Sequence, residues 1–245
     1  MSRSETARHL ELKRQALIWA QAHGYRAAAA EVSLPNYGFR LDVAAYRADR
    51  VREVQPGGRV RLRPRVGMTA VFECKASRVD FLRDARSLEV TAERLKVLHE
   101  RRGRIEQELL IHYPSISNGD SLFQEYHSVD FQRPGHERYQ RTLRDIQRLS
   151  ARLHANTKFD RLVKWGAASL FWVVADPGVI AEHEIPAGWG LLVSNGECLQ
   201  IAMKPLLHAI GEAERLSLLH RIALAASRAV NREHGIGFED LRMME

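Results

Sequence analysis

The segment VFECKASRVDF, residues 71–81, combines a short apolar run with a glutamate and a lysine at alternate positions. In a β-strand, residues two apart share one face, so Glu73 and Lys75 lie together while Cys74 points the other way, into the core. Burying a charged group is costly unless the charge is paired or bound to a ligand. Two interpretations remain: the two charges neutralise each other, or they belong to a site that binds a third component.

Apolar periodicity divides the rest of the chain into helices and strands. Their order is a helix, three strands, a long helical segment, two or three strands and a final helix, which favours an α/β fold with a mixed sheet flanked by helices. Hairpin spacing predicts antiparallel pairing of the early strands, and the helical crossover predicts a parallel partner later. The expected helices cover residues 4–23, 77 to about 102, 139–153, 157–167 and 216–235. The expected strands cover residues 27–34, 39–46, 68–75, 169–175, 188–194 and 198–203.

Length and composition are those of a globular chain with a real core. The 245 residues, 45% of them hydrophobic and 27% charged, are enough for one large domain and give no sign of disorder. No apolar stretch approaches the roughly 20 residues of a membrane span, and the N-terminal residues lack the apolar core of a signal peptide. Two cysteines, Cys74 and Cys198, each lie in an apolar strand-like run. We therefore expect a cytoplasmic protein with reduced thiols and no membrane partner.

Basic residues are concentrated between residues 47 and 67. The net charge of the chain is +7, and this segment holds seven arginines against two acids. The sequence PGG at 56–58 predicts a turn, so we expect a projecting two-stranded ribbon that Pro64 restricts to an edge. In an extended conformation four of the arginines share one side: Arg59, Arg61, Arg63 and Arg65. They either track the phosphates of a nucleic acid or belong to a solvated hairpin that charge keeps soluble.

Three acidic residues lie in apolar strands that follow one another in the chain. Glu31 follows four alanines, Asp42 interrupts FRLDVAAY, and Glu73 belongs to the segment quoted above. Magnesium prefers oxygen ligands, and one or two carboxylates suffice because the ion keeps several waters. A lysine beside the ion can orient a water or stabilise charge on a phosphoryl group. Each residue alone fits a strand-edge ion pair or a turn-side acid, but the combination suits metal-assisted phosphodiester hydrolysis.

Other motifs are less informative. The chain has no G-x-x-x-x-G-K-[ST] phosphate loop, no C-x-x-C pair and no G-x-S-x-G elbow, which argues against an ATP-driven motor, a zinc finger and a serine hydrolase. Ser77, three residues before Asp80, predicts a helix N-cap, and Arg78 and Asp80 either support the site or belong to that cap. The sequence EHE at 182–184 fits an exposed loop.

The sequences RLD at 40–42 and ECK at 73–75 resemble the active-site motif of the PD-(D/E)xK nuclease superfamily. Three longer stretches, EVSLPNYGFRLDVAAY, FECKASRVDFLRD and LFWVVADPGVIAEHEIPAGWGLLV, extend the resemblance to the MmcB-type DNA-repair endonucleases. In that group the lysine is followed by a Ser-Arg-x-Asp-Phe segment, and a later strand ends near Pro-x-x-x-Gly-Leu. The matching positions here are Ser77, Arg78, Asp80 and Phe81, then Ile185, Pro186, Gly190 and Leu191. The resemblance covers residues 4–87 and 157–203.

The resemblance implies a restriction-endonuclease-like core with a defined set of site residues. Asp42 and Glu73 would bind Mg²⁺ or Mn²⁺, Lys75 would position the attacking water, and Glu31 would be an accessory acid. The implied substrate is DNA, in repair or processing, with RNA as a variant of the same chemistry. The alternative from another class is a non-catalytic nucleic-acid-binding or assembly module that keeps the fold and the ribbon but needs no metal.

The expected domain organisation departs from the family pattern in two segments. We expect one nuclease-like domain over residues 1–245, with the basic ribbon at 47–67 as an excursion from it. Residues 88–156 are much longer than a simple crossover, so they are expected to form a helical insertion. That insertion would act as a wall or clamp beside the cleft, or as the surface of a homodimer.

Overall fold

The computed structural model describes residues 6–34, 38–56, 58–83, 89–112, 136–154 and 157–237. These residues form a six-stranded sheet in which the order of the strands in space is their order in the chain. The strands are β1 (Ala27–Leu34), β2 (Phe39–Val54), β3 (Val60–Lys75), β4 (Leu170–Ala175), β5 (Gly190–Ser194) and β6 (Leu199–Met203). The helices are α1 (Ala7–Ala22), α2 (Arg78–Arg83), α3 (Glu89–His112), α4 (Glu137–Leu153), α5 (Lys158–Lys164), the 3-10 turn η4 (Glu182–Glu184) and α6 (Glu212–Glu233).

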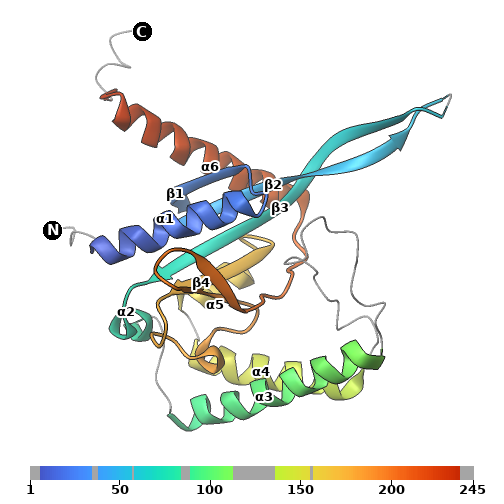
Figure 1. The fold of residues 1–245 in the computed structure, drawn as a ribbon, viewed down its shortest axis with the longest axis vertical. Helices are drawn as coiled ribbons and strands as arrows, with labels where there is room; N and C mark the ends of the chain where they lie inside the picture. The colour runs from blue at the N-terminus through green and yellow to red at the C-terminus, as the bar shows by residue number, and fades with distance from the viewer. Residues whose placement is uncertain are drawn as a thin grey trace.

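The pairing of the strands is mixed, as predicted. β1, β2 and β3 form an antiparallel meander, β3 pairs in parallel with β4 and β4 with β5, and β6 returns antiparallel to β5. The chain leaves β3 and reaches its parallel partner β4 only after α2 to α5, which is the helical crossover that the sequence indicates (Figure 1). The predicted fold class is confirmed: a mixed central sheet flanked by helices, consistent with a restriction-endonuclease-like core.

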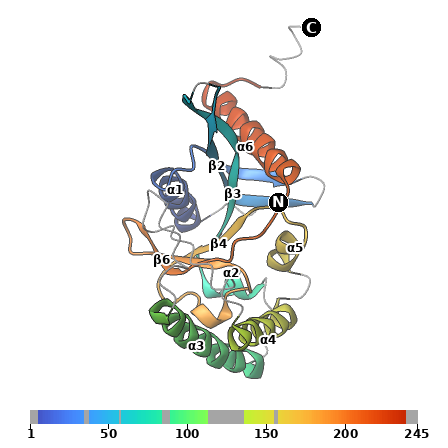
Figure 2. The same ribbon diagram turned by 90° about the vertical axis from the view of Figure 1, so that its right-hand side faces the viewer.

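Helices cover both faces of the sheet. Figure 2 shows α1 on one side and α5 and α6 on the other. Neighbouring residues of β3 therefore enter different cores: Phe72 packs with Trp19 of α1, whereas Val71 packs with Leu218 of α6. Burial on both faces explains why residues 68–75 are an almost continuous apolar run rather than an alternating one.

The long β2–β3 hairpin confirms the predicted ribbon. Both strands continue past the edge of the sheet and project from the molecule (Figure 1). The pairing shifts register between Arg47 and Asp49, and Gly67 lies against this irregularity, where a Cβ atom would be only 2.0 Å from the Arg47 carbonyl oxygen. Glycine is therefore required where the ribbon leaves the sheet.

The helical segment differs in detail from its predicted bounds. In place of one helix from residue 77 to about 102, the structure has the short α2 and then α3, which continues to His112. α3 and α4 pack side by side at the end of the molecule away from the ribbon (Figures 1 and 2). Their shared core consists of Ile105, Leu109, Tyr139 and Leu143. Residues 113–135 of the expected helical insertion lie outside the described residues.

The prediction that Cys198 lies within an apolar strand is wrong. Its side chain is exposed and it precedes β6, because Asn195 and Gly196 make the β5–β6 turn. The Asn195 side chain accepts hydrogen bonds from the backbone of Glu197 and Cys198, and Gly196 has a positive φ. Asn-Gly is a strong hairpin signal, and it places the following residues in the loop. None of the helices among the described residues is long and apolar enough to cross a bilayer.

Candidate active site

The ribbon that separates Asp42 from Glu73 in the sequence also places them side by side. Val43 of β2 pairs with Phe72 of β3, so Asp42 and Glu73 occupy the next positions on two antiparallel strands. The charge of Asp42 contributes to the raised pKa of Glu73, as expected for two carboxyl groups at close range. A separation of 31 residues in the chain is thus closed by one hairpin.

Asp42 is held from the α1 side of the sheet. Its Oδ2 accepts a hydrogen bond of 2.8 Å from the backbone N–H of Cys74. Its Oδ1 lies 3.4 Å from His9 Nε2 and 3.5 Å from Lys13 Nζ, both of α1. Burial opposes ionisation of Asp42, but the hydrogen bond from His9 and the charges of Lys158, His9 and Lys13 lower its pKa to about 2. Asp42 is therefore a carboxylate at neutral pH.

Glu73 has the opposite electrostatic character. Its side chain is 2% exposed, its Oε2 accepts a 2.7 Å hydrogen bond from Lys158 Nζ of α5, and its Oε1 is buried without a hydrogen-bond partner among the described residues. Burial and, second, the charge of Asp42 raise its pKa to about 7, against the charges of Lys158 and Lys75. Near neutral pH this carboxyl group is therefore only partly ionised, and a further cation would ionise it fully.

Lys75 lies two residues beyond Glu73 on the same strand and faces the same core. It is buried, and its ammonium group lies 5.5 Å from the centre of the Phe159 ring of α5. Its charge lowers the pKa of Glu73, which places the two groups within electrostatic reach. The structure therefore assembles the three residues of the expected motif: Asp42, Glu73 and Lys75.

Glu31 reaches the site indirectly. It is the one described non-glycine residue with a positive φ, 58°, and it interrupts β1 between the paired residues Ala30 and Val32. Its carboxylate forms ion pairs with Lys13 and with Arg40, the latter at 2.5 Å. Lys13 therefore links Glu31 to Asp42. Left-handed backbone at a residue with a Cβ costs about 1–2 kcal/mol, and such strain is concentrated at functional sites.

Sequence reasoning missed three basic residues of this site. His9 and Lys13 lie four apart on α1, where a lysine is ordinarily solvated, yet Lys13 is 3% exposed. Lys158 follows Thr157, whose side chain caps α5. A lysine in the first turn of a helix is disfavoured by the helix dipole. The position of Lys158 in the sequence therefore indicates that an acidic partner compensates for this cost. That partner is Glu73.

The structure also tests the expectations for the residues that follow Lys75 and for residues 182–184. Ser77 caps α2 as predicted, accepting a 3.2 Å hydrogen bond from the backbone of Asp80. Arg78 has a partner outside the group formed by Asp42, Glu73 and Lys75: its guanidinium binds both carboxylate oxygens of Glu184. The expectation that residues 182–184 form an exposed loop is therefore wrong for Glu184, which is buried because Arg78 and the backbone of Ala181 satisfy its charge.

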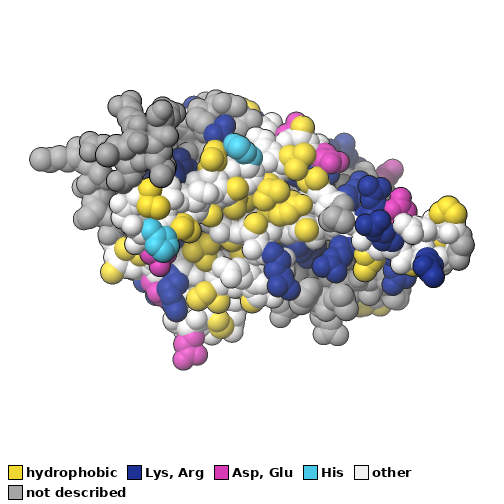
Figure 3. Space-filling model, turned by 90° about the horizontal axis from the view of Figure 1, so that it is seen from above, with side chains coloured by type: hydrophobic (Ala, Val, Ile, Leu, Met, Phe, Trp, Pro, Cys, Tyr) yellow, Lys and Arg dark blue, Asp and Glu magenta, His cyan; other side chains and the backbone are white. Residues whose placement is uncertain are grey.

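The ribbon carries its arginines on two different faces. Arg61 and Arg65 lie opposite Glu53 and Asp49, so acids lie among the four arginines on the predicted side. The other side carries Arg50 and Arg52 together with three exposed aliphatic residues, Val54, Val60 and Leu62. Figure 3 shows lysine and arginine side chains gathered toward the end where the ribbon projects. Arg59, Arg61, Arg63 and Arg65 are all exposed, as a surface that contacts a polyanion requires.

Comparison with known proteins identifies no family. No protein-family model and no curated protein matches the sequence. Among solved structures, the chain is similar to the SPO1766 protein of unknown function from Silicibacter pomeroyi. The match has a TM-score of 0.47 and 16% sequence identity, and it covers 94% of each chain.

Proposed function

We propose that this protein is a metal-dependent nuclease that hydrolyses phosphodiester bonds of DNA, in repair or processing. Asp42 and Glu73 would hold Mg²⁺ or Mn²⁺, and Lys75 would orient the attacking water. Glu31 would act as an accessory acid through Lys13. The proposal rests on the meeting of these side chains at the ends of β2 and β3.

One observation supports a cation at this position more than any other. Glu73 is buried beside a second carboxylate, its pKa is raised to about 7, and its Oε1 has no partner among the described residues. A dication would supply the missing partner for Oε1 and remove the repulsion between the two carboxylates. An all-carboxylate donor set also suits the hard oxygen preference of Mg²⁺.

The chemistry divides between the ion and the side chains. When bound, a divalent ion polarises the scissile phosphate and stabilises the charge that develops on it. Lys75, an ammonium group in a buried position, would hold a water by hydrogen bonding and keep it oriented toward the phosphorus. Asp42, with its pKa of about 2, stays ionised and holds its geometry through the Cys74 backbone N–H.

The ribbon supports DNA as the substrate class. Its exposed arginines provide sequence-independent contacts to phosphates, and its length lets it reach along a duplex from the sheet that carries the site. The other face carries exposed aliphatic residues, Val54, Val60 and Leu62, beside Arg50 and Arg52, and a leucine beside basic residues is one of the side chains that minor-groove-binding proteins insert. RNA would share the chemistry, and comparing cleavage of matched DNA and RNA distinguishes the two.

A non-catalytic binding module has its own support in the site. Lys158 already binds one oxygen of Glu73, and Lys13 lies beside Asp42, so lysines offset the charge of both acids without a metal. In such a module the carboxylates would serve only to fix α1 and α5 against the sheet. The ribbon would keep its role.

Calorimetric titration with Mg²⁺ separates the two functions. We expect one Mg²⁺ to bind the wild-type protein, and Asp42→Asn and Glu73→Gln each to weaken that binding by at least about tenfold, or about 1.4 kcal/mol. Glu197→Gln, which neutralises an exposed carboxylate in the β5–β6 turn, is the matched control and should bind like the wild type. Absence of Mg²⁺ binding in the wild type would favour the module.

A further inference from the structure

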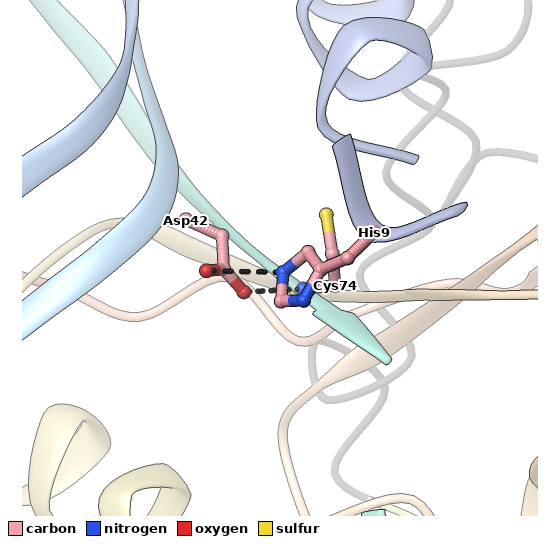
Figure 4. A group of neighbouring side chains, drawn as sticks. All are labelled: His9, Asp42 and Cys74. Atoms are coloured by element: carbon pink, nitrogen blue, oxygen red, sulfur yellow. Dashed lines mark hydrogen bonds and ion pairs between the residues drawn. The ribbon is translucent and has the colours of Figure 1, made fainter. Parts of the chain in front are cut away.

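His9, Asp42 and Cys74 form a second cluster on the α1 side of the sheet. One ligand atom from each, a ring nitrogen, a carboxylate oxygen and the thiol sulfur, all lie within 4.8 Å of one another. Figure 4 shows the three side chains, which come from α1, β2 and β3, and the contacts of Asp42 with the other two residues. Residues far apart in the chain thus converge on one point.

The donor set of this cluster differs from that of the proposed nuclease centre. Thiolate and imidazole are ligands that Zn²⁺ and Co²⁺ prefer, whereas Mg²⁺ prefers oxygen. Bond lengths of 2.0–2.3 Å in a tetrahedral zinc site place the ligand atoms about 3.5 Å apart, so a contraction of about 1 Å completes the arrangement. We propose that His9, Asp42 and Cys74 bind a zinc-type divalent cation, with water as the fourth ligand.

The hydrogen bonding and the exposure of the three residues are compatible with a bound cation. Oδ2 of Asp42 is fixed by the backbone of Cys74, which leaves Oδ1, the oxygen nearest His9, as the ligand atom. Cys74 is fully buried, whereas His9 and Asp42 are partly exposed, so an ion enters from their side. The thiol loses its proton to water as the sulfur–metal bond forms.

Lys13 opposes this binding. Its ammonium group lies 3.5 Å from Oδ1 of Asp42, so a cation there meets like charge. Lys13 also forms an ion pair with Glu31. When a cation binds Asp42, the ammonium group can therefore move away from Asp42 and stay paired with Glu31. The conservative change Lys13→Met should therefore tighten metal binding, whereas loss of a ligand should weaken it.

Cobalt substitution gives a direct test because a thiolate–Co²⁺ bond has its own charge-transfer absorption. The measurement uses the full chain carrying Cys198→Ser, since Cys198 is exposed and is the second of the two cysteines. We expect one Co²⁺ per chain with that band, displaced by Zn²⁺ at far lower concentrations than by Mg²⁺, which does not favour a thiolate ligand. The band should vanish in Cys74→Ala, and affinity should fall at least tenfold in His9→Gln.

Two controls separate loss of a ligand from loss of the fold: a measurement of folding and a variant outside the cluster. Circular dichroism checks the fold of each variant, and if Cys74→Ala does not fold, the partly exposed His9→Gln carries the test. Glu73→Gln should keep the band, because Glu73 binds Lys158 rather than this cluster. No band in the Cys198→Ser protein, or a band and affinity unchanged by His9→Gln, would overturn the proposal.

Because Asp42 is common to both centres, a zinc-type ion here would compete with Mg²⁺ and inhibit cleavage. That consequence rests on the proposed function, whereas the cobalt band does not. A band in the cobalt titration, together with no DNA cleavage when Mg²⁺ or Mn²⁺ is the only metal added, would therefore refute the nuclease and leave the zinc-type site standing. Cleavage by a protein that gives no cobalt band would refute the zinc-type site and leave the nuclease standing.

Discussion

At the scale of single residues, the two neighbouring carboxyl groups of Asp42 and Glu73 have pKa values shifted in opposite directions. Glu73 is buried and Asp42 is partly exposed on the neighbouring strand, and the pKa of Asp42 is about 2 whereas that of Glu73 is about 7. The difference follows from their surroundings. Burial and, second, the charge of Asp42 raise the pKa of Glu73, whereas at Asp42 the effect of burial is outweighed by the hydrogen bond from His9 and the charges of Lys158, His9 and Lys13. Pairs of titratable groups driven apart in pKa are typical of sites with chemical function.

Glu73 should make the metal-free protein less stable as the pH rises from about 5 to 7. Its pKa rises from 4.5 to about 7 on folding, so the folded state keeps a proton that the unfolded chain releases. This stability is complete below pH 4.5 and is lost as the pH passes through 7. The free energy of unfolding of the wild type, measured in urea with a chelator, should fall relative to Glu73→Gln by up to about 1.4 kcal/mol per pH unit.

Comparison with Glu73→Gln is needed because buried histidines act in the opposite sense. His99 and His154 have pKa values lowered to about 4 by burial, so they add stability as the pH rises from 4 to 6.5. Their effect is common to both proteins and cancels in the difference. A difference that stays constant between pH 5 and 7.5 would contradict the electrostatic description of Glu73.

At the scale of elements, the ribbon has a structural role and also carries the charge on which the proposed DNA binding depends. It closes the distance between the two acids, and it carries an exposed array of arginines away from the sheet. The sequence predicted its turn from PGG and its charge from the arginine run, because both are local properties. It did not predict that Asp49 and Glu53 lie opposite Arg65 and Arg61, because cross-strand register depends on the bulge at Gly67.

Arg61 and Arg65 should contribute to DNA affinity through phosphate contacts. Changing both to glutamine should weaken binding uniformly across sequences and reduce the slope of log affinity against log salt concentration by about 2, close to 0.9 per phosphate. Fluorescence anisotropy over a salt series measures this slope. Arg26→Gln with Arg228→Gln removes two exposed charges elsewhere and is the matched control. Equal effects of the two pairs would mean that the ribbon acts only through net charge.

At the scale of the whole molecule, the central sheet could be predicted from the sequence, but the basic residues that surround the two acids could not. Apolar runs, turn residues and chain order are sufficient to indicate the mixed sheet and the face shared by Glu73 and Lys75. The basic residues around the acids come from α1 and α5, and helix periodicity alone makes Lys13 and Lys158 look solvated. Only packing of these helices against the sheet brings their ammonium groups to Asp42 and Glu73.

Cleavage of supercoiled plasmid DNA in the presence of Mn²⁺ tests the proposed hydrolysis most directly. The comparison is between the wild type and Lys75→Met, which keeps the length of the side chain but removes the ammonium group. We expect the wild type to nick or linearise the plasmid and Lys75→Met to be slower by about 10²-fold or more, with metal binding retained. Cleavage that survives the loss of Lys75, or a wild-type protein that binds metal and DNA without cutting, would contradict the assignment.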